Sequence, residues 1–207
     1  MTLKPDELPN QYTLLDQLEH NELVPFIRTY LRKRNRYSLL YYFCNLLAFG
    51  WAGYFLVSGY GQESYNLGDR FSYFAYGLAI AFALVPVHEC IHVLAYRSQG
   101  ARNTSYDVNL KKFYFMALAD KFVADRKEFS VVALAPFVTI TAILIILFFV
   151  AGTNWQLTVI GVFLAHTAMC SGDFGLLSYF EFHREKEVVT YDDVESRRSF
   201  FYARSKA

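Results

Sequence analysis

Residues 71–97 read FSYFAYGLAIAFALVPVHECIHVLAYR, an apolar segment with two histidines and a glutamate in its second half. Phe71 to Val87 contains no Asp, Glu, Lys or Arg, and apolar character continues past the polar residues to Tyr96. A helix of about 20 apolar residues crosses the ~30 Å hydrocarbon core of a bilayer. The segment therefore predicts a membrane span that carries ionisable side chains, which are costly there and by default mark a functional site.

Two further stretches are long enough to cross a membrane. Residues 38–62 contain no Asp, Glu, Lys or Arg, and within residues 129–180 the only such residue is Asp173. The second stretch is too long for a single span, and residues 152–154 (Gly-Thr-Asn) supply a turn in its middle. The sequence therefore predicts four transmembrane helices, near 38–59, 71–97, 130–151 and 155–180.

The composition agrees with a small polytopic membrane protein. Of 207 residues, 54% are hydrophobic, 18% are aromatic and only 19% are charged, whereas an average soluble domain has roughly a quarter charged residues. Eleven glycines and five prolines are too few for a collagenous or disordered chain. Three cysteines, all in apolar stretches, do not form a disulfide framework. A net charge of +1 gives no reason to predict nucleic-acid binding.

The basic residues predict the topology. All of the 20 Lys and Arg except Arg70 lie before the first span, between residues 97 and 127, or from residue 184 onward. The positive-inside rule then places both termini and residues 98–128 in the cytoplasm. We predict an amphipathic cytoplasmic segment at 1–37, a four-helix membrane domain at 38–180 and a cytoplasmic tail at 181–207. The first segment should lie along the inner membrane surface with two helical patches, one at Leu14, Leu15 and Leu18 and the other at Val24, Phe26, Ile27, Tyr30 and Leu31.

Within the second span, His88, Glu89 and His92 form an HExxH motif. Positions four apart share one face of a helix, so the two imidazoles can bind a single metal ion. Glu89 lies beside them, where it can accept a proton from water bound to the metal. The simpler alternative is a set of polar side chains that line a helix interface.

A catalytic zinc site needs a third protein ligand and an open position for water. Apart from Glu89, Asp173 is the only carboxylate within the predicted spans. Counted from the cytoplasmic ends of the second and fourth spans at 1.5 Å per residue, Asp173 lies at a depth between those of His88 and His92. We therefore predict Asp173 as the third ligand, although a helix-terminal aspartate exposed by chance is the alternative.

His166 lies seven residues before Asp173, on nearly the same helix face but about 10 Å deeper. It is a possible direct ligand, a hydrogen-bonding neighbour of the metal site, or a histidine that only packs at a helix interface. Cys170, one turn before Asp173, could serve as a soft ligand, but we favour a packing role.

These residues carry a resemblance to a known family. The transmembrane HExxH, the later Ala135-Pro136, His166 and residues 171–173 (Ser-Gly-Asp) resemble a bacterial group described as "putative zincin peptidases". That group is similar to intramembrane zinc metalloproteases of the site-2 protease type, although no NPxPxxxLDG run surrounds Asp173. The resemblance implies an all-α membrane metallopeptidase in the bacterial inner membrane, with one zinc ion per chain and a membrane protein or peptide as substrate.

The resemblance also implies a mechanism. His88, His92 and Asp173 would hold zinc, and Glu89 would act as general base on the zinc-bound water. The substrate would be a helix that must unwind to expose its peptide bonds. Residues 106–110 and 113–115 alternate like two short strands. A short hairpin there could bind an extended substrate segment at its edge, through the following residues: Val108, Leu110, Phe113 and Phe115. The alternative is a solvated loop with incidental aromatic residues.

Other functions stay open on the sequence alone. A membrane module could bind metal for structure or transport without catalysis, although such a site has no need of Glu89 beside the first histidine. Hydrolysis of a non-peptide amide or ester fits the same residues. A di-iron membrane hydroxylase needs many more histidines than the three in the predicted spans.

Overall fold

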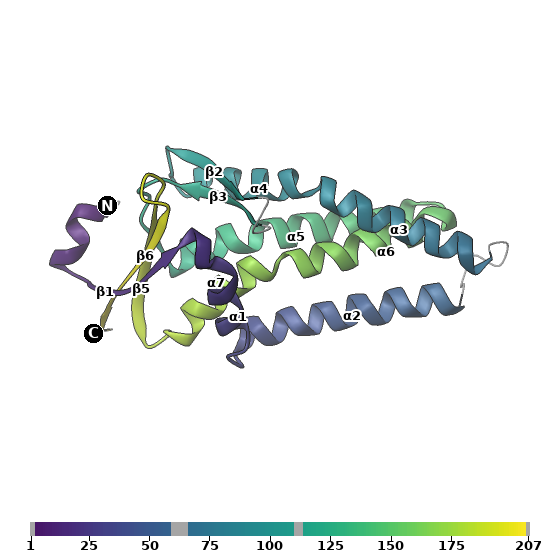
Figure 1. The fold of residues 1–207 in the computed structure, drawn as a ribbon, viewed down its shortest axis with the longest axis horizontal. Helices are drawn as coiled ribbons and strands as arrows, with labels where there is room; N and C mark the ends of the chain where they lie inside the picture. The colour runs from purple at the N-terminus through teal and green to yellow at the C-terminus, as the bar shows by residue number, and fades with distance from the viewer. Residues whose placement is uncertain (1–2, 59–65, 110–113, 206–207) are drawn as a thin grey trace. The chain divides into compact units, whose positions relative to one another are not determined.

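The computed structural model describes residues 3–58, 66–109 and 114–205. The described chain is mostly helical and also contains six strands (Figure 1). The helices are α1 (Leu23–Leu31), α2 (Arg36–Ser58), α3 (Leu67–Ala83), α4 (Val85–Ser98), α5 (Arg126–Val150), α6 (Thr153–Met169) and α7 (Ser171–Phe182). The strands are β1 (Thr13–Glu19), β2 (Thr104–Asn109), β3 (Tyr114–Ala119), β4 (Ala124–Asp125), β5 (Lys186–Asp193) and β6 (Arg198–Ser205). Short 3-10 helices span Pro5–Asn10 and His20–Glu22.

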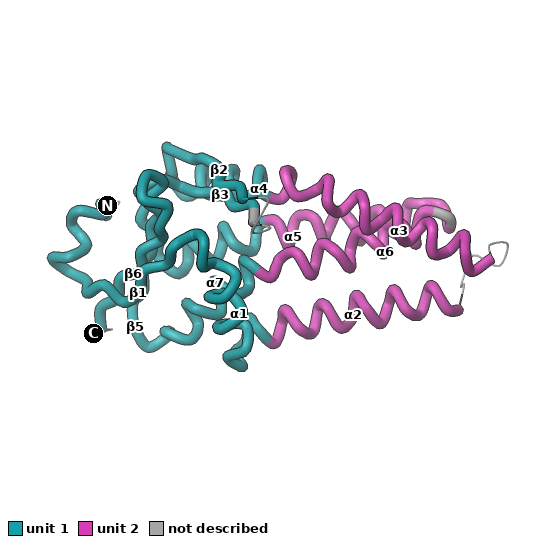
Figure 2. Tube along the Cα trace, viewed as in Figure 1, with its two compact units in different colours: residues 1–38, 89–135, 172–207 teal, residues 39–88, 136–171 magenta. Residues whose placement is uncertain are grey.

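The chain divides into two compact units (Figure 2). The first contains residues 1–38, 89–135 and 172–207, and the second contains residues 39–88 and 136–171. The division falls between His88 and Glu89, inside the single helix α4. The three-part division at residues 37 and 180 that the sequence suggested stays a prediction.

The first unit contains a four-stranded sheet in the order β1-β6-β5-β4, with antiparallel neighbours. Figure 1 shows β5 and β6 side by side near the C-terminus. Alternate residues of β6 are buried, and one of them, Phe201, packs against Tyr179 of α7 with ring centroids 4.5 Å apart. The chain is mostly helical, as expected, but the sheet is more than the one short hairpin that the sequence suggested. Residues 186–205 form a second hairpin, whose apolar face completes the core of this unit.

The secondary structure of the N-terminal segment differs in part from the predicted helical patches. Residues 13–19, expected to be a helical patch, form β1 and pair with β6. Their leucine spacing suits a helix, but pairing with β6 decides the conformation, and Leu18 is the buried one of the three leucines. The second expected patch is a helix, since Leu23, Ile27 and Leu31 lie buried along α1.

The hairpin expected between the second and third spans is present in the first unit. Strands β2 and β3 pair antiparallel, with Val108 opposite Phe115. The ring of Phe115 lies 5.8 Å from that of Tyr106 across the pair, measured between centroids. Leu110 and Phe113, two of the predicted substrate-binding residues, lie outside the described residues.

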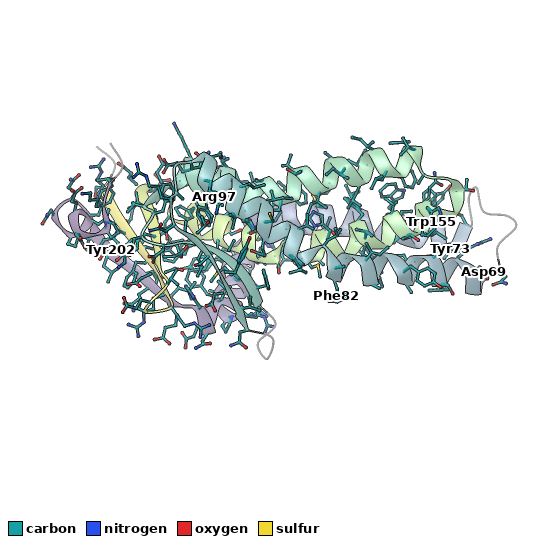
Figure 3. The ribbon with its side chains drawn as sticks, turned by 90° about the horizontal axis from the view of Figure 1, so that it is seen from above. Asp69, Tyr73, Phe82, Arg97, Trp155 and Tyr202 are labelled. Carbon is teal, nitrogen blue, oxygen red and sulfur yellow. The ribbon has the colours of Figure 1, made fainter. Side chains whose placement is uncertain are left out.

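In the second unit, α3 and α6 pack with their backbones in direct contact. A Cβ atom added at Gly77 would lie 2.1 Å from the carbonyl oxygen of Thr158, and one added at Gly161 would lie 2.4 Å from that of Phe74. The Thr158 hydroxyl donates a hydrogen bond of 2.9 Å to the carbonyl oxygen of Tyr73. Farther along the pair, the Tyr73 ring meets the Trp155 ring edge-on, with centroids 6.0 Å apart (Figure 3). Small residues allow this close approach, as they do between many membrane helices.

Three helical segments in the described chain are long and apolar enough to cross a membrane: Arg36–Ser58, Arg126–Val150 and Trp155–Phe182. A fourth is counted if α3 and α4 form one span, bent by 42°. The sequence predicted a single helix at 71–97, but Pro86 has no N–H to bond a carbonyl one turn earlier, so the helix breaks at Leu84 and restarts. Pro136 lies inside α5, ten residues after its start at Arg126.

Candidate metal centre

The HExxH residues lie on α4, which restarts after the break at Leu84. The His88 amide donates to the Leu84 carbonyl over 2.9 Å, so His88 is already within the helical hydrogen-bond ladder. Because α4 is one continuous helix, helical geometry places the His88 and His92 side chains on one face, a single turn apart.

The backbone orients the imidazole of His92. Nδ1 of His92 lies 3.0 Å from the carbonyl oxygen of Val132 in α5, and the residue is 8% exposed. A carbonyl oxygen can only accept, so Nδ1 carries the proton of this hydrogen bond. In the neutral ring the lone pair is then on Nε2, which is the arrangement that metal-binding histidines adopt.

The Asp173 carboxylate lies beside the same nitrogen. It lies in the first turn of α7, where the helix dipole stabilises a carboxylate. Its Oδ1 lies 3.1 Å from Nε2 of His92. One ligand atom from each of His88, His92 and Asp173 lies within 4.8 Å of the others. The side chains that the sequence singled out as metal ligands therefore converge on one point, while their role as ligands stays a prediction.

The donor chemistry of this set fits zinc. Catalytic zinc sites commonly combine two histidines with one carboxylate and leave a fourth position open. Ligands about 2.0–2.1 Å from a tetrahedral zinc ion are about 3.4 Å apart, and the separation of 3.1 Å between His92 and Asp173 is close to that value. Small side-chain movements would bring the remaining pairs to the same spacing.

Glu89 is held by the neighbouring hairpin. Its Oε2 accepts a hydrogen bond of 2.7 Å from the backbone amide of Ala117, and the residue is 6% exposed. Ala117 is opposite Tyr106 in the β2–β3 pair. In an antiparallel pair the N–H and C=O of a residue face either toward or away from the partner strand. Since the Ala117 amide donates to Glu89, it points away from β2. The backbone edge of β3 that does not pair with β2 therefore faces the carboxylate.

His166 belongs to a second donor set, which lies wholly within the second unit. Ligand atoms of His88, His166 and Cys170 also lie within 4.8 Å of one another. The His166 and His88 ring centroids are 6.0 Å apart, and Cys170 Sγ lies 3.9 Å from Nε2 of His166. The ring of Phe137 stacks on His166, with centroids 6.3 Å apart. The sequence analysis favoured a packing role for Cys170 and did not foresee this grouping.

Two partners of the site were missed because they are backbone groups. The Val132 carbonyl orients His92, and the Ala117 amide holds Glu89. Any residue type supplies the same carbonyl, so no side-chain pattern could have indicated Val132. The alternating residues of β3 did predict a strand near the motif, and a strand edge is a natural source of free amides.

Residues 81–186, just over half of the chain, match the model of a family described as "putative zincin peptidase". The matched segment extends from the end of α3 through α7, and it includes every residue of both donor sets together with Glu89. No curated protein and no solved structure matches the chain.

Proposed function

The chain belongs to the family described as "putative zincin peptidase", and we propose that it is an intramembrane zinc metallopeptidase that hydrolyses peptide bonds of membrane-embedded or membrane-proximal substrates. Membership of a zincin family implies zinc and suggests peptidase chemistry. The observation that carries the proposal is the separation of 3.1 Å between Oδ1 of Asp173 and Nε2 of His92. His92 lies on the same helix as Glu89. The motif itself supplies two ligands and the general base, and the third ligand is the feature that it leaves undetermined.

In this proposal His88, His92 and Asp173 hold the ion. When bound, zinc acts as a Lewis acid that polarises the scissile carbonyl and makes the attacking water more acidic. Glu89 accepts the proton of that water and returns it to the leaving amine. The Val132 carbonyl keeps Nδ1 of His92 protonated, so that Nε2 stays available as a ligand.

The hairpin supplies a place for the substrate backbone. The edge of β3 that bonds Glu89 through Ala117 can pair with an extended peptide, as sheet edges do in β-strand addition. In the structure the Ala117 amide is used by Glu89. Binding of a substrate carbonyl to this amide would free the carboxylate beside the metal ligands. Val108 and Phe115, which lie opposite each other in the hairpin, stay proposed contacts for substrate side chains.

The membrane location is part of the proposal and is supported by the helices long and apolar enough to cross a bilayer. The distribution of basic residues supports a cytoplasmic location for both termini and residues 98–128. Cysteine substitution at Gln62 and Ser105, followed by labelling with a reagent that does not cross membranes, tests this. We expect labelling from opposite sides, and labelling of both from one side would contradict the four-span topology.

Cleavage assays with a Glu89→Gln variant test the enzymatic part. Glutamine keeps the size of the side chain and can still accept the Ala117 amide, but it cannot take up a proton from water. Zinc content should therefore stay unchanged while turnover of a membrane substrate falls by at least about a hundredfold. Glu185→Gln, at a side chain that is 87% exposed, is the matched control and should retain full activity. Undiminished cleavage by zinc-loaded Glu89→Gln would refute the proposed mechanism.

A second candidate function is a metal carrier or structural metal module. The second donor set favours it, because His88 is common to both sets and could pass an ion from Asp173 to Cys170. A carrier should lose zinc when Cys170 is replaced by serine and should cleave nothing. The peptidase should keep both zinc and activity after that substitution.

A further inference from the structure

A cluster of arginines lies around a cavity of the first unit, at residues that the proposed peptidase does not use. The cavity has a volume of about 510 Å³, and it is lined by Arg34, Asn35, Arg36, Glu181, Phe182 and Arg184. These residues lie at or just before the start of α2 and at or just after the end of α7. Their charges decide what the cavity can bind.

One carboxylate faces three guanidinium groups. Glu181 lies 2.9 Å from Arg36, 3.8 Å from Arg184 and 3.9 Å from Arg126, measured between the nearest nitrogen and oxygen atoms. Arg36 and Arg184 line the cavity, Arg126 does not, and Arg34 is the third arginine of the lining. The lining therefore carries a net charge of +2, from three arginines and the one carboxylate of Glu181. Arg184 also contacts Glu185 over 3.2 Å, at a carboxylate that is 87% exposed and strongly hydrated.

Two arginines of the lining are well exposed to solvent. The side chains of Arg36 and Arg184 are 63% and 66% exposed, whereas that of Glu181 is 9% exposed. The guanidinium group presents several N–H donors in a planar fork, which matches the oxygens of a phosphate group. A cavity with a buried carboxylate and an excess of exposed arginines is therefore suited to an anion with several oxygens.

Apolar surface borders the same cavity. Phe182 is 51% exposed, and the Lys33 ammonium lies 5.0 Å from the centroid of its ring. The neighbouring helices α2 and α7 belong to segments long and apolar enough to cross a membrane. Cations at the ends of such helices lie at the level of the lipid headgroups. An amphiphilic anion matches this surface better than a small hydrated ion does.

We propose that this cavity binds the phosphate group of an anionic phospholipid, with Arg36 and Arg184 as the principal donors and Phe182 in contact with the glycerol and upper acyl region. The inference rests on the proposed membrane location and is independent of peptidase activity, because none of these residues belongs to the metal centre. Bound lipid would fix the start of α2 against the end of α7.

Titration of the full-length, zinc-loaded protein in a neutral detergent tests the proposal. The ligand is short-chain phosphatidylglycerol, the matched zwitterionic lipid is phosphatidylcholine of the same chain length, and inorganic phosphate is the soluble anion. The measurement is the shift of the thermal unfolding midpoint as each ligand is added. We expect a saturable rise with phosphatidylglycerol and a much smaller one with the other two compounds.

Two substitutions should change the affinity in opposite directions. A cationic residue near an anionic lipid surface contributes about fivefold to binding, so Arg184→Gln should weaken phosphatidylglycerol binding by about that factor. Glu181→Gln removes the internal counter-charge and should tighten binding by a similar factor. Arg102→Gln, which removes the same charge at an exposed residue outside the cavity, should leave the affinity unchanged.

The outcomes separate the possibilities. Equal shifts with phosphatidylglycerol and phosphatidylcholine, or an equal loss in Arg102→Gln and Arg184→Gln, would overturn the proposed site. Equal shifts with inorganic phosphate and phosphatidylglycerol would overturn the assignment of a lipid as the ligand. Zinc content, measured on the same samples, should be unchanged in all variants, so the result does not depend on the metal centre.

Discussion

The close contact between α3 and α6 predicts a large effect of a single methyl group. In Gly77→Ala the added Cβ would lie 2.1 Å from the Thr158 carbonyl oxygen and 2.8 Å from the Gly161 Cα, where ordinary contacts begin at 3.4 Å. The obstructing atoms are backbone atoms, so no change of rotamer can relieve the overlap. The two helices must separate by about 1 Å, which is the scale of overpacking that costs about 1–3 kcal/mol.

The separation would also break a hydrogen bond. The Thr158 hydroxyl lies 2.9 Å from the Tyr73 carbonyl oxygen, and a further 1 Å would take this pair beyond hydrogen-bonding distance, at a cost of about 1 kcal/mol. Alanine in place of glycine in a helix returns about 0.5–1 kcal/mol. The expected net loss for Gly77→Ala is therefore about 1–3.5 kcal/mol in the free energy of unfolding.

Equilibrium unfolding of detergent-solubilised protein by a denaturing detergent measures this value. The control is Gly53→Ala in α2, where an added Cβ would meet no atom within 4 Å, so this variant should be stabilised by up to about 1 kcal/mol. Gly161→Ala should resemble Gly77→Ala, because its Cβ would lie 2.4 Å from the Phe74 carbonyl oxygen. Equal stabilities of Gly77→Ala and Gly53→Ala would refute the close backbone approach of α3 and α6.

Two further predictions concern the hairpin. Burial raises the pKa of the Asp107 carboxyl, but hydrogen bonds from Arg197 and His20 outweigh it and hold that pKa below its ordinary value. This carboxylate should stabilise the fold above about pH 4 and lose that effect as the pH falls through its folded-state pKa. The free energy of unfolding should therefore differ between wild type and Asp107→Asn by about 1–3 kcal/mol near neutral pH, and this difference should vanish as acid protonates Asp107. Ala117→Pro removes the amide that holds Glu89 but spares the N–H groups that pair β3 with β2. We expect this substitution to raise the KM for a membrane substrate about tenfold or more and to leave the zinc content unchanged. An unaltered KM would contradict the role of this strand edge.

The proximity of the candidate ligands could be predicted from side-chain type and spacing. The HExxH spacing placed His88 and His92 on one face of a helix, and counting residues from the helix ends brought Asp173 to their level. Both inferences need only the rise of a helix and the rarity of charge within apolar segments. The structure finds Asp173 3.1 Å from His92.

The four-stranded sheet was not predicted, because its strands are brought together from opposite ends of the chain. Thr13–Glu19 pairs with Arg198–Ser205, and a leucine spacing compatible with a helix concealed the first of these strands. In the second, alternate burial of Ser199, Phe201 and Ala203 has the period of a strand. The alternating pattern of a strand was therefore present in residues 198–205. Which face of that strand is buried, however, depends on contacts with α7 that a local sequence pattern does not contain.

The break in the helix at Leu84 was also not predicted, although the sequence contains a proline two residues later, Pro86. Proline permits either a kinked continuous span or two helices, and neighbouring packing decides between them. Backbone partners such as the Val132 carbonyl have no sequence signature at all.

X-ray absorption at the zinc edge of the purified protein tests the central claim most directly, because the two donor sets differ in a single element. The set of His88, His92 and Asp173 contains only nitrogen and oxygen, whereas the set of His88, His166 and Cys170 contains sulfur. We predict about one zinc per chain, with nitrogen and oxygen neighbours near 2.0–2.1 Å and no sulfur, and a spectrum that changes in Asp173→Ala but not in Cys170→Ser. A sulfur neighbour near 2.3 Å, or a protein that retains no zinc, would contradict the proposed metallopeptidase site.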